Sequence, residues 1–191
     1  MQKSIEVKEK LISATMELLE ASSGHPDAVT TRAIAEKAGV GVGLINYHFR
    51  SKELLIQECV QRVIEQVVSR FKPKQTQYES DQERLTDWAA QVFDFLTENR
   101  AISRISILGD MQEYSIQSNS VKTQQGLSYA IRETLPDSEK QWLSFLLVSV
   151  MQVAFLGSDA CRERLGYDFT KPEDRRAFLS RLVSTLIPSN P

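Results

Sequence analysis

The sequence predicts an all-α protein, and three of its features support that prediction. Apolar residues recur at spacings of three and four along most of the chain, as at Leu11, Ala14 and Leu18, which is the period of an amphipathic helix. No run of alternating apolar and polar residues competes as a strand. Polar stretches with Gly or Pro separate the helical segments. We expect a small N-terminal domain over residues 1–50 and a larger helical domain over residues 51–191.

The first two helices are expected on either side of a short polar turn. A helical pattern covers residues 5–20 and ends at residues 22–26. Thr30 is a good N-cap for a second, short helix. The inward face of that helix would consist of Ile34, Ala35 and Ala38. Gly39 then supplies a left-handed turn, because glycine adopts positive φ angles readily.

The third and fourth helices follow directly. The third begins near Val42 and would bury Ile45 and Phe49. Ser51 is the expected N-cap of the fourth helix. The apolar face of this long helix would consist of Leu55, Cys59, Val63 and Val67. The polar, proline-containing stretch 72–82 is expected to lie near the break between the N-terminal and C-terminal domains, with the fourth helix bridging them.

Helical patterns fill the chain beyond Glu83. Two residue pairs have the spacing of a capping box, in which a hydroxyl is followed three residues later by Glu or Gln. They are Ser138 with Gln141 and Thr170 with Glu173. We expect the last two helices to begin at these pairs. The apolar stripe of the last helix would consist of Leu179, Leu182, Val183 and Leu186.

The composition narrows the class of protein. The formal charge is −2, so attraction to nucleic acid must come from a local patch. Cys59 and Cys161 lack a CxxC partner, which favours reduced thiols. The charged N-terminus lacks the apolar core of a secretory signal, and polar residues interrupt the short apolar stretch 142–156, so it is not expected to span a membrane. We therefore expect a cytoplasmic protein with no membrane partner.

Residues 30–49 are expected to form a helix-turn-helix, in which two short helices are joined by a tight turn at Gly39. Burial of Ile45 and Phe49 fixes the orientation of the second helix, since each residue advances about 100° around the axis. The residues that then point outward are Gly43, Asn46 and Tyr47, with Leu44 and His48 on the flanks. One helical face is therefore free to enter a DNA groove.

The charges of this region supply the local patch that the whole chain lacks. They are Arg32, Lys37, Arg50 and Lys52 against Glu36, which gives four minus one, a net charge of +3. Thr30 and Thr31 stand at the N-terminus of the second helix, where hydroxyls and backbone amides can bind phosphates. DNA binding is the function that this pattern favours.

Residues 30–55, TTRAIAEKAGVGVGLINYHFRSKELL, closely resemble the TetR family of regulators. The shared order is a capped helix, a glycine turn, a recognition helix and a following helix that bears a lysine. The resemblance implies that Thr31 bonds a phosphate, that Arg32 approaches a base edge or the backbone, and that Lys52 clamps a phosphate. By the same resemblance, the residues expected to face the major groove are Val42, Gly43, Leu44, Asn46 and Tyr47. His48 is expected to contact a phosphate or to pack.

Two residues depart from the family pattern. Gly41 stands where the family often has a capping serine, and Asn46 stands where an aromatic residue is frequent. Asparagine can pair bidentately with adenine, whereas Val42 and Gly43 offer only shape and methyl contacts. The family pattern therefore does not predict the base sequence of the DNA operator.

Other kinds of site find little support in the sequence. The run GVGVG at residues 39–43 lacks the preceding strand and the GK[ST] ending of a phosphate-binding loop. His25 and His48 have no partners at zinc-ligand spacing. No serine lies in a nucleophile elbow, and no carboxylate pair stands out from an ordinary charged helix surface. We expect no cofactor, no metal and no catalytic site.

The C-terminal helices suggest a homodimer. The helix of residues 142–156 is apolar nearly all the way round, which a helix at the surface of a monomer does not sustain. Pairing this helix and the last helix with their symmetry mates would make a four-helix interface, and the resemblance implies the same. A twofold dimer would call for a palindromic DNA operator with half-sites about 34–36 Å apart.

The resemblance further implies that the larger domain binds a small-molecule effector. Pocket linings are mainly aromatic and apolar with a few polar anchors. The candidates of these types are Trp88, Phe95, Arg104, Met111, Tyr114, Phe145, Gln152 and Phe155. Arg104 could pair with an acidic ligand, although such residues are more often ordinary core or surface.

The favoured hypothesis is a homodimeric repressor that a small molecule releases from its operator. One alternative is an all-helical small-molecule-binding or adaptor protein whose helix-turn-helix is only structural, which predicts no salt-dependent affinity for DNA. Another is a helical enzyme, which needs a catalytic constellation that the sequence does not display.

Overall fold

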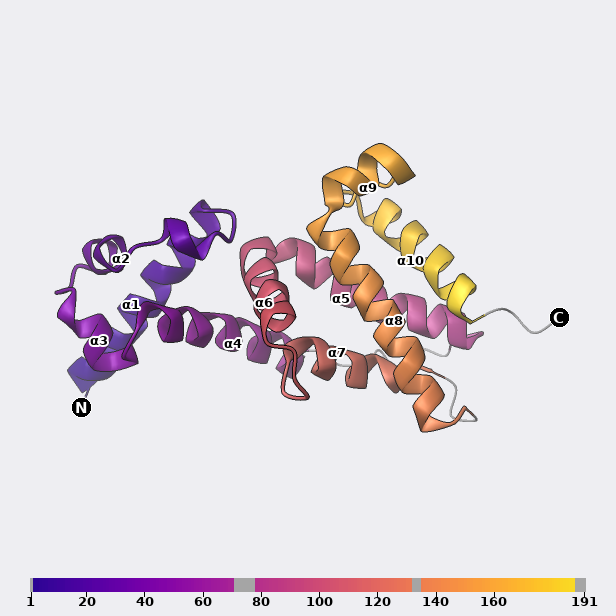
Figure 1. The fold of residues 1–191 in the computed structure, drawn as a ribbon, viewed down its shortest axis with the longest axis horizontal. Helices are drawn as coiled ribbons and strands as arrows, with labels where there is room; N and C mark the ends of the chain where they lie inside the picture. The colour runs from indigo at the N-terminus through magenta and orange to yellow at the C-terminus, as the bar shows by residue number, and fades with distance from the viewer. Residues whose placement is uncertain (1, 71–77, 132–134, 188–191) are drawn as a thin grey trace. The chain divides into compact units, whose positions relative to one another are not determined.

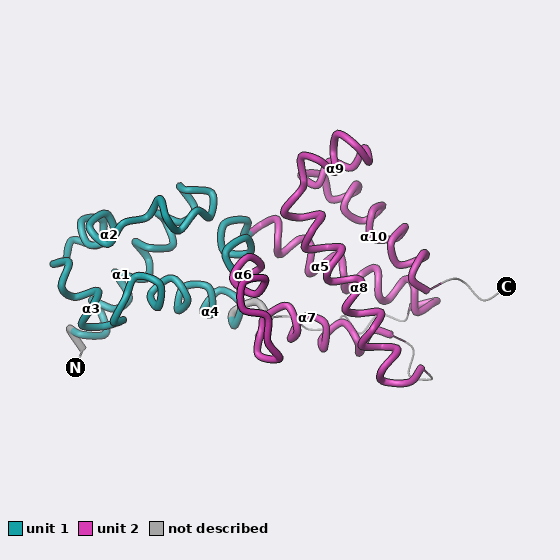
Figure 2. Tube along the Cα trace, viewed as in Figure 1, with its two compact units in different colours: residues 1–72, 99–106 teal, residues 73–98, 107–191 magenta. Residues whose placement is uncertain are grey.

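The structure is a computed structural model that describes residues 2–70, 78–131 and 135–187. Over these residues it consists of ten α-helices and one short 3-10 helix (Figure 1), which confirms the all-α prediction. The helices divide between two compact units (Figure 2). Unit 1 comprises residues 1–72 and 99–106, and unit 2 comprises residues 73–98 and 107–191.

Unit 1 is built from helices that share one apolar core. It contains α1 (Gln2–Ala21), η1 (Pro26–Ala28), α2 (Thr31–Ala38), α3 (Gly43–Phe49), α4 (Lys52–Arg70) and the first part of α6 (Arg100–Gln112). Helix α1 packs against α2 and α4, and α3 packs against α2 and α4. The side chains that fill the core include Leu11, Leu19, Ile34, Ile45 and Leu55, all fully buried.

The helix ends of unit 1 follow the predicted local chemistry. The Thr30 hydroxyl accepts a hydrogen bond of 3.1 Å from the Ala33 amide, and the Ser51 hydroxyl accepts one of 3.2 Å from the Leu54 amide. Gly39 has a φ of 66° and ends α2 in the left-handed conformation. The two hydroxyls satisfy amides that a bare helix start leaves open, and the Gly39 amide donates to the Ala35 and Glu36 carbonyls at the end of α2. All three predicted ends are therefore confirmed.

Helix α4 extends the N-terminal unit beyond its expected boundary. Leu55, Cys59 and Val63 are buried as predicted, while the side chain of Val67 lies outside the described residues, as does most of the stretch 72–82. The whole of α4 belongs to unit 1. The compact units therefore do not divide after residue 50.

Gly24 permits a close approach between the turn after α1 and the first turn of α6. Its φ is +75°, and a Cβ at this position would lie 2.6 Å from the carbonyl oxygen of Ala101. Only glycine fits here without displacing the backbone. Residues 99–106 belong to unit 1 and the rest of α6 belongs to unit 2, so the two units share this helix (Figure 2).

Unit 2 packs five further helices around an aromatic centre. They are α5 (Asp81–Glu98), α7 (Asn119–Ser128), α8 (Asp137–Leu156), α9 (Ser158–Leu165) and α10 (Pro172–Leu186), joined by the end of α6. Helix α10 lies along α5, and α8 packs against α7, α5 and α10 (Figure 1). The Phe169 ring meets Phe93 and Phe178 edge to face, at centroid distances of 5.0 and 5.1 Å.

A buried arginine ties α10 to α5. Arg175 is 8% exposed, and its Nε donates to Asp94 at 2.6 Å while its Nη1 donates to the Phe169 carbonyl at 2.9 Å. A buried guanidinium is tolerated only when it is paired in this way. The pair therefore fixes the register of the two helices.

The two predicted capping boxes in unit 2 are wrong, because a proline sets each helix start. Helix α8 begins directly after Pro136, so Ser138 lies inside its first turn and makes no cap. Helix α10 begins at Pro172, and the Thr170 hydroxyl instead donates to the Asp168 carboxylate at 2.7 Å. In α10 the proline occupies the first helical position, which its fixed φ suits and where no amide is lost, whereas in α8 Pro136 itself takes the cap position.

The apolar stripe of α10 serves the core of its own unit. Leu179 and Val183 are fully buried there, and Leu182 and Leu186 pack against the same core. The outward face of α10 is mostly polar, with Arg176, Ala177, Ser180, Arg181 and Ser184 exposed. The predicted use of this stripe for pairing with a symmetry mate therefore conflicts with its burial within the protomer.

Candidate nucleic-acid interface

Helices α2 and α3 position the candidate interface. Ile34 and Ala35 are buried on α2, and Ile45 and Phe49 are buried on α3. These four side chains anchor both helices to the core of unit 1, and the turn at Gly39 sets their relative direction. The opposite side of α3 is thereby held at the surface on a rigid support.

The residues on that surface are those that the sequence predicts. Tyr47 is 77% exposed and Val42 is 47% exposed. Gly43 and Asn46 are also exposed, while Leu44 and His48 are half-buried on the flanks. The structure thus brings together one outward face of α3 that carries an amide, a phenol and an open backbone at Gly43.

Aromatic contacts link this face to the core. The Tyr47 and His48 rings meet edge to face at a centroid distance of 4.9 Å, and His48 is tilted toward Phe49 at 6.3 Å. The Lys8 ammonium also lies 5.5 Å from the Phe49 ring centroid, within cation–π range. Tyr47 is therefore braced by its neighbour rather than free on all sides.

The predicted positive patch contains four cations, but the structure leaves only some of them available to an anion. The Lys37 ammonium lies 2.8 Å from a Glu17 carboxylate oxygen, which offsets its charge. The Lys52 ammonium donates to the Pro26 carbonyl at 3.1 Å. Arg32 and Arg50 are exposed, and no ion pair joins either of them to another described residue. These two arginines are the cations most available to an anion.

The N-terminus of α2 offers donors beside this patch. Thr30 is exposed and Thr31 is half-buried. The Thr30 hydroxyl oxygen accepts from Ala33, so its own proton remains available to an external acceptor. A phosphate at this point would also meet the positive end of the helix dipole.

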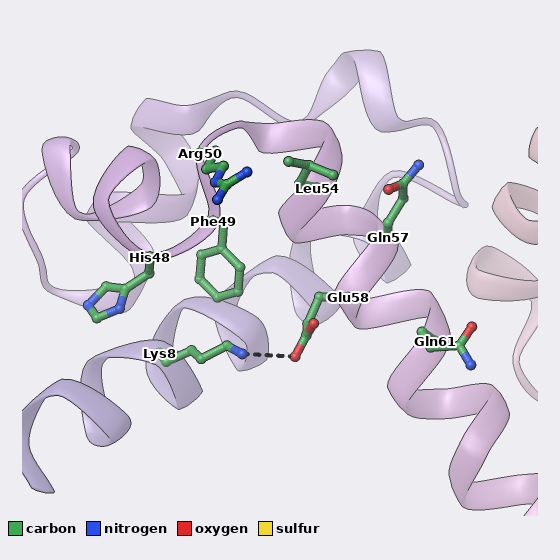
Figure 3. A pocket seen from close by; sticks show the side chains of 8 residues that line it. All are labelled: Lys8, His48, Phe49, Arg50, Leu54, Gln57, Glu58 and Gln61. Atoms are coloured by element: carbon green, nitrogen blue, oxygen red, sulfur yellow. Dashed lines mark hydrogen bonds and ion pairs between the residues drawn. The ribbon is translucent and has the colours of Figure 1, made fainter. Parts of the chain in front are cut away.

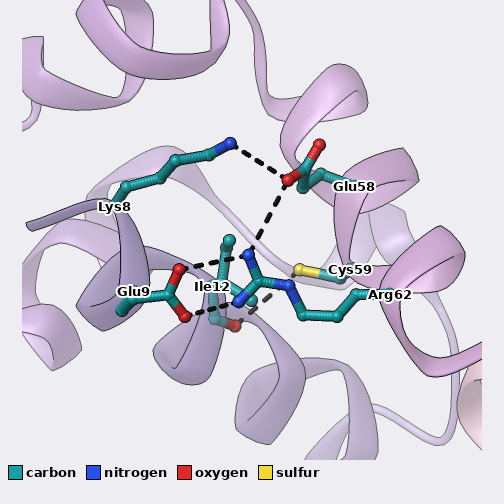
Figure 4. A network of polar contacts seen from close by, with 6 residues as sticks. All are labelled: Lys8, Glu9, Ile12, Glu58, Cys59 and Arg62. Atoms are coloured by element: carbon teal, nitrogen blue, oxygen red, sulfur yellow. Dashed lines mark hydrogen bonds and ion pairs between the residues drawn. The ribbon is translucent and has the colours of Figure 1, made fainter. Parts of the chain in front are cut away.

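An ion-pair network fastens α1 to α4 (Figure 4). Lys8 pairs with Glu58 at 3.0 Å, and Arg62 binds both carboxylate oxygens of Glu9, one of them at 3.1 Å. The Arg62 hydrogen bonds hold the pKa of Glu9 below its usual range. Because these side chains are partly exposed, each pair contributes less than about 1 kcal/mol, and their main effect is to set the register of α1 on α4.

A pocket of about 410 Å³ opens beside this network (Figure 3). Its lining consists of Lys8, His48, Phe49, Arg50, Leu54, Gln57, Glu58 and Gln61. Of these residues, only His48 was a predicted site residue. The others were missed because the pocket forms between α1, the end of α3 and α4, a packing that local patterns do not specify. The outward spacing of Leu54, Gln57 and Gln61 on α4 is the one signal that the sequence offered.

The predicted effector-binding residues lie in different surroundings. Arg104 belongs to unit 1 and the others belong to unit 2. Phe155 is buried, Trp88, Phe95 and Gln152 are half-buried, and Met111, Tyr114 and Phe145 are exposed. Tyr114 accepts a hydrogen bond of 2.7 Å from Gln124.

One polar cluster in unit 2 involves a predicted residue. Gln152 donates to the Ser120 hydroxyl at 2.7 Å, and that hydroxyl donates to Asp110 at 2.6 Å. The cluster joins α8, α7 and α6 and fixes the orientation of the Gln152 side chain.

The described parts of the chain contain neither a metal-ligand cluster nor a single membrane-spanning helix. No group of three His, Cys, Asp or Glu side chains there is arranged to hold a metal ion. No single described helix is long and apolar enough to cross a membrane, and α8 and α9 reach that length only as a pair bent by 94°.

The arrangement of α2, turn and α3 is a helix-turn-helix, and comparisons with known proteins show what it resembles. Residues 11–59 match the family described as bacterial regulatory proteins, tetR family. The chain is also 30% identical over 74 residues to the HTH-type transcriptional regulator BetI of Vibrio campbellii, a match that covers 39% of this chain and 36% of that protein.

Solved structures agree over nearly the whole chain. A TetR-like transcriptional regulator from Rhodococcus sp. RHA1 has a TM-score of 0.65 at 18% identity, over 96% of this chain and 97% of that chain. A tetR-family transcriptional regulator from Streptomyces coelicolor has a TM-score of 0.58 at 20% identity, over 97% and 90%. At these identities the likeness shows the fold alone. The family match adds that residues 11–59, which contain this helix-turn-helix, resemble the tetR family.

Proposed function

We propose that the chain is a homodimeric repressor that binds a palindromic operator and is released from it by a small molecule. The observation that carries the DNA-binding part is the outward face of α3, where Asn46 and the 77% exposed Tyr47 stand on a helix anchored by Ile45 and Phe49. A rigid, exposed helix with these side chains has the form that the major groove accepts.

The proposed DNA contacts are of two kinds, those that read bases and those that position the protein on the phosphates. Asn46 reads a base edge, with Tyr47, Val42, Gly43 and Leu44 shaping the contact in the groove. Thr30, Thr31, Arg32, His48 and Lys52 bind phosphates and set the register. Lys52 keeps its hydrogen bond to Pro26 in this role, because an ammonium has three donors.

The proposed dimer packs through the exposed face of α8. Trp142, Phe145, Val150 and Val153 are 54, 41, 39 and 63% exposed, and the first two rings stack at a centroid distance of 6.0 Å. Their spacing places them on one side of the helix, and a contiguous apolar surface of this kind marks an interaction site. Since α10 directs its stripe inward, we assign it a supporting part in the interface.

Release by an effector requires that unit 2 influence unit 1. Helix α6 supports this step, since its first part packs in unit 1 beside Gly24 and its remainder belongs to unit 2. We place the effector among the predicted residues of unit 2, with Gln152 and Phe155 as the first to test. An effector that prefers one position of α6 would shift the DNA-binding equilibrium by its differential affinity.

Two exposed tyrosines provide a matched test of the DNA-binding surface. Tyr47 and Tyr129 are 77 and 80% exposed, and Tyr129 lies in unit 2. Affinity of the full chain for duplex DNA, measured by fluorescence anisotropy, should fall as salt rises from about 50 to 200 mM. Tyr47→Ala should weaken binding, and Tyr129→Ala should not. Equal effects of the two substitutions, or no affinity for DNA, would contradict the proposal.

A further inference from the structure

Two cations stand at the corner where α3 ends and α4 begins, and the structure holds them differently. Lys52 is half-buried and directed to the Pro26 carbonyl, 3.1 Å from its Nζ. Arg50 is exposed, and its guanidinium makes no ion pair with another described residue. A guanidinium has five N–H donors in a planar fork that suits phosphate oxygens. We propose that Arg50 binds a DNA phosphate at this corner, in addition to the contacts expected of Lys52.

The backbone at Arg50 supports a specific role for its side chain. Its φ is 69° and its ψ is −39°, and Ser23 is the other non-glycine residue with positive φ in the described part of the chain. Glycine would occupy this conformation without the steric penalty of a Cβ. A side chain kept in such a position is often part of a functional site. The Arg50 amide donates to the Asn46 carbonyl at 3.0 Å, so this conformation also closes the recognition helix.

The surroundings leave Arg50 free for an external anion. Figure 3 shows Arg50 above the Phe49 ring, on the rim of the pocket between His48 and Leu54. The acidic member of the lining, Glu58, pairs with Lys8 at 3.0 Å. Arg50 follows Asn46 by four residues, about 6 Å along a helix axis. If Asn46 enters the groove, Arg50 therefore reaches the phosphates at its edge.

The inference rests on the proposed DNA binding. Three substitutions separate the effect of the Arg50 charge from the effect of its backbone strain. Arg50→Gln removes the charge but keeps the backbone strain, Arg50→Gly removes both, and Arg50→Lys keeps the charge. The matched control is Arg164→Gln, which removes an exposed arginine of α9 in unit 2. For each full-length variant, affinity for an operator selected from random DNA and for an unrelated duplex is measured between about 50 and 200 mM salt, together with Tm.

Arg50→Gln should weaken binding to both duplexes and lower the slope of log affinity against log salt by about 2 for a dimer, one phosphate contact per subunit. Arg50→Gly should lose the same slope while its Tm stays within a few degrees of the wild-type value, because the extra freedom that glycine gives the unfolded chain offsets relief of the positive φ. Arg50→Lys should retain the slope, and so should Arg164→Gln.

A slope of the wild-type value in both Arg50→Gln and Arg50→Gly would overturn the role of Arg50. A loss confined to the selected operator would also overturn it, because it would assign Arg50 to base reading. If Arg50→Gln unfolds, Arg50→Gly carries the test, since it relieves the strain. Absence of salt-dependent binding by the wild-type chain would instead refute the proposed DNA-binding function itself.

Discussion

Replacing Val153 by glutamate should separate the proposed dimer while leaving each protomer folded. Val153 is 63% exposed on α8, so the core of unit 2 loses little when it is replaced. In a twofold dimer that packs through α8, both introduced carboxylates would enter one interface. A buried charge without a partner is costly, and two like charges add repulsion.

The exposed face of α8 sets the size of the effect. Complete burial of a large apolar side chain contributes about 1.5–3 kcal/mol. Trp142, Phe145, Val150 and Val153 are 54, 41, 39 and 63% exposed, so burying the remainder contributes about 1 kcal/mol each. Two protomers together gain about 8 kcal/mol before the entropic cost of association. Val153→Glu should remove at least about 3 kcal/mol of this, a weakening of about a hundredfold or more in the dimer Kd.

Sedimentation at micromolar protein concentration measures the dimer, and operator titration measures its consequence. Val153→Glu should sediment as a monomer and bind the operator more weakly, since two half-sites are gripped together only when the DNA-binding units are linked. The control is Ile116→Glu, at an 80% exposed apolar side chain between α6 and α7, which should remain dimeric. A Val153→Glu protein that stays dimeric with unchanged operator affinity would refute α8 as the interface.

Three other substitutions test separate parts of the structure. Thr30→Ala should lower the free energy of unfolding by about 1 kcal/mol through loss of the α2 cap, measured as a lower urea midpoint; an unchanged midpoint would contradict the cap. Asn46→Ala should cost about 1–3 kcal/mol per half-site on the preferred operator and spare unrelated DNA; an unchanged ranking of operators would assign base reading to other groups. Burial raises the pKa of Cys59 to about 12, above the roughly 8.5 of an unfolded thiol. Its contribution to stability is therefore complete below about pH 8.5 and lost as pH rises toward 12, so Cys59→Ala should make the alkaline decline of unfolding free energy shallower.

Local chemistry made the N-terminal unit predictable. Thr30 and Gly39 act on backbone groups within a few residues of themselves, so their roles follow from the sequence alone. Burial of Ile45 and Phe49 then fixes which face of α3 points outward, because the helical period leaves no other choice. The exposed residues of the candidate interface were found in this way.

Prediction failed where two local signals competed or where distant segments met. Ser138 and Thr170 carry good capping chemistry, but a neighbouring proline starts each helix instead. The period of α10 shows that Leu182 faces an apolar surface without showing whether that surface belongs to the same protomer. The contacts of Lys8 with Glu58 and of Lys52 with Pro26 join residues 50 and 26 positions apart, beyond the reach of any local pattern.

The most direct test of the central claim is selection of bound sites from random duplex DNA by the full chain. The structure of α3 and the proposed twofold dimer predict an enriched sequence of two inverted half-sites, with centres about 10–10.5 base pairs apart or a multiple of that spacing. Affinity for that sequence should fall steeply with salt. Recovery of no enriched sequence, or an affinity independent of salt, would contradict the claim that this helix-turn-helix recognises DNA.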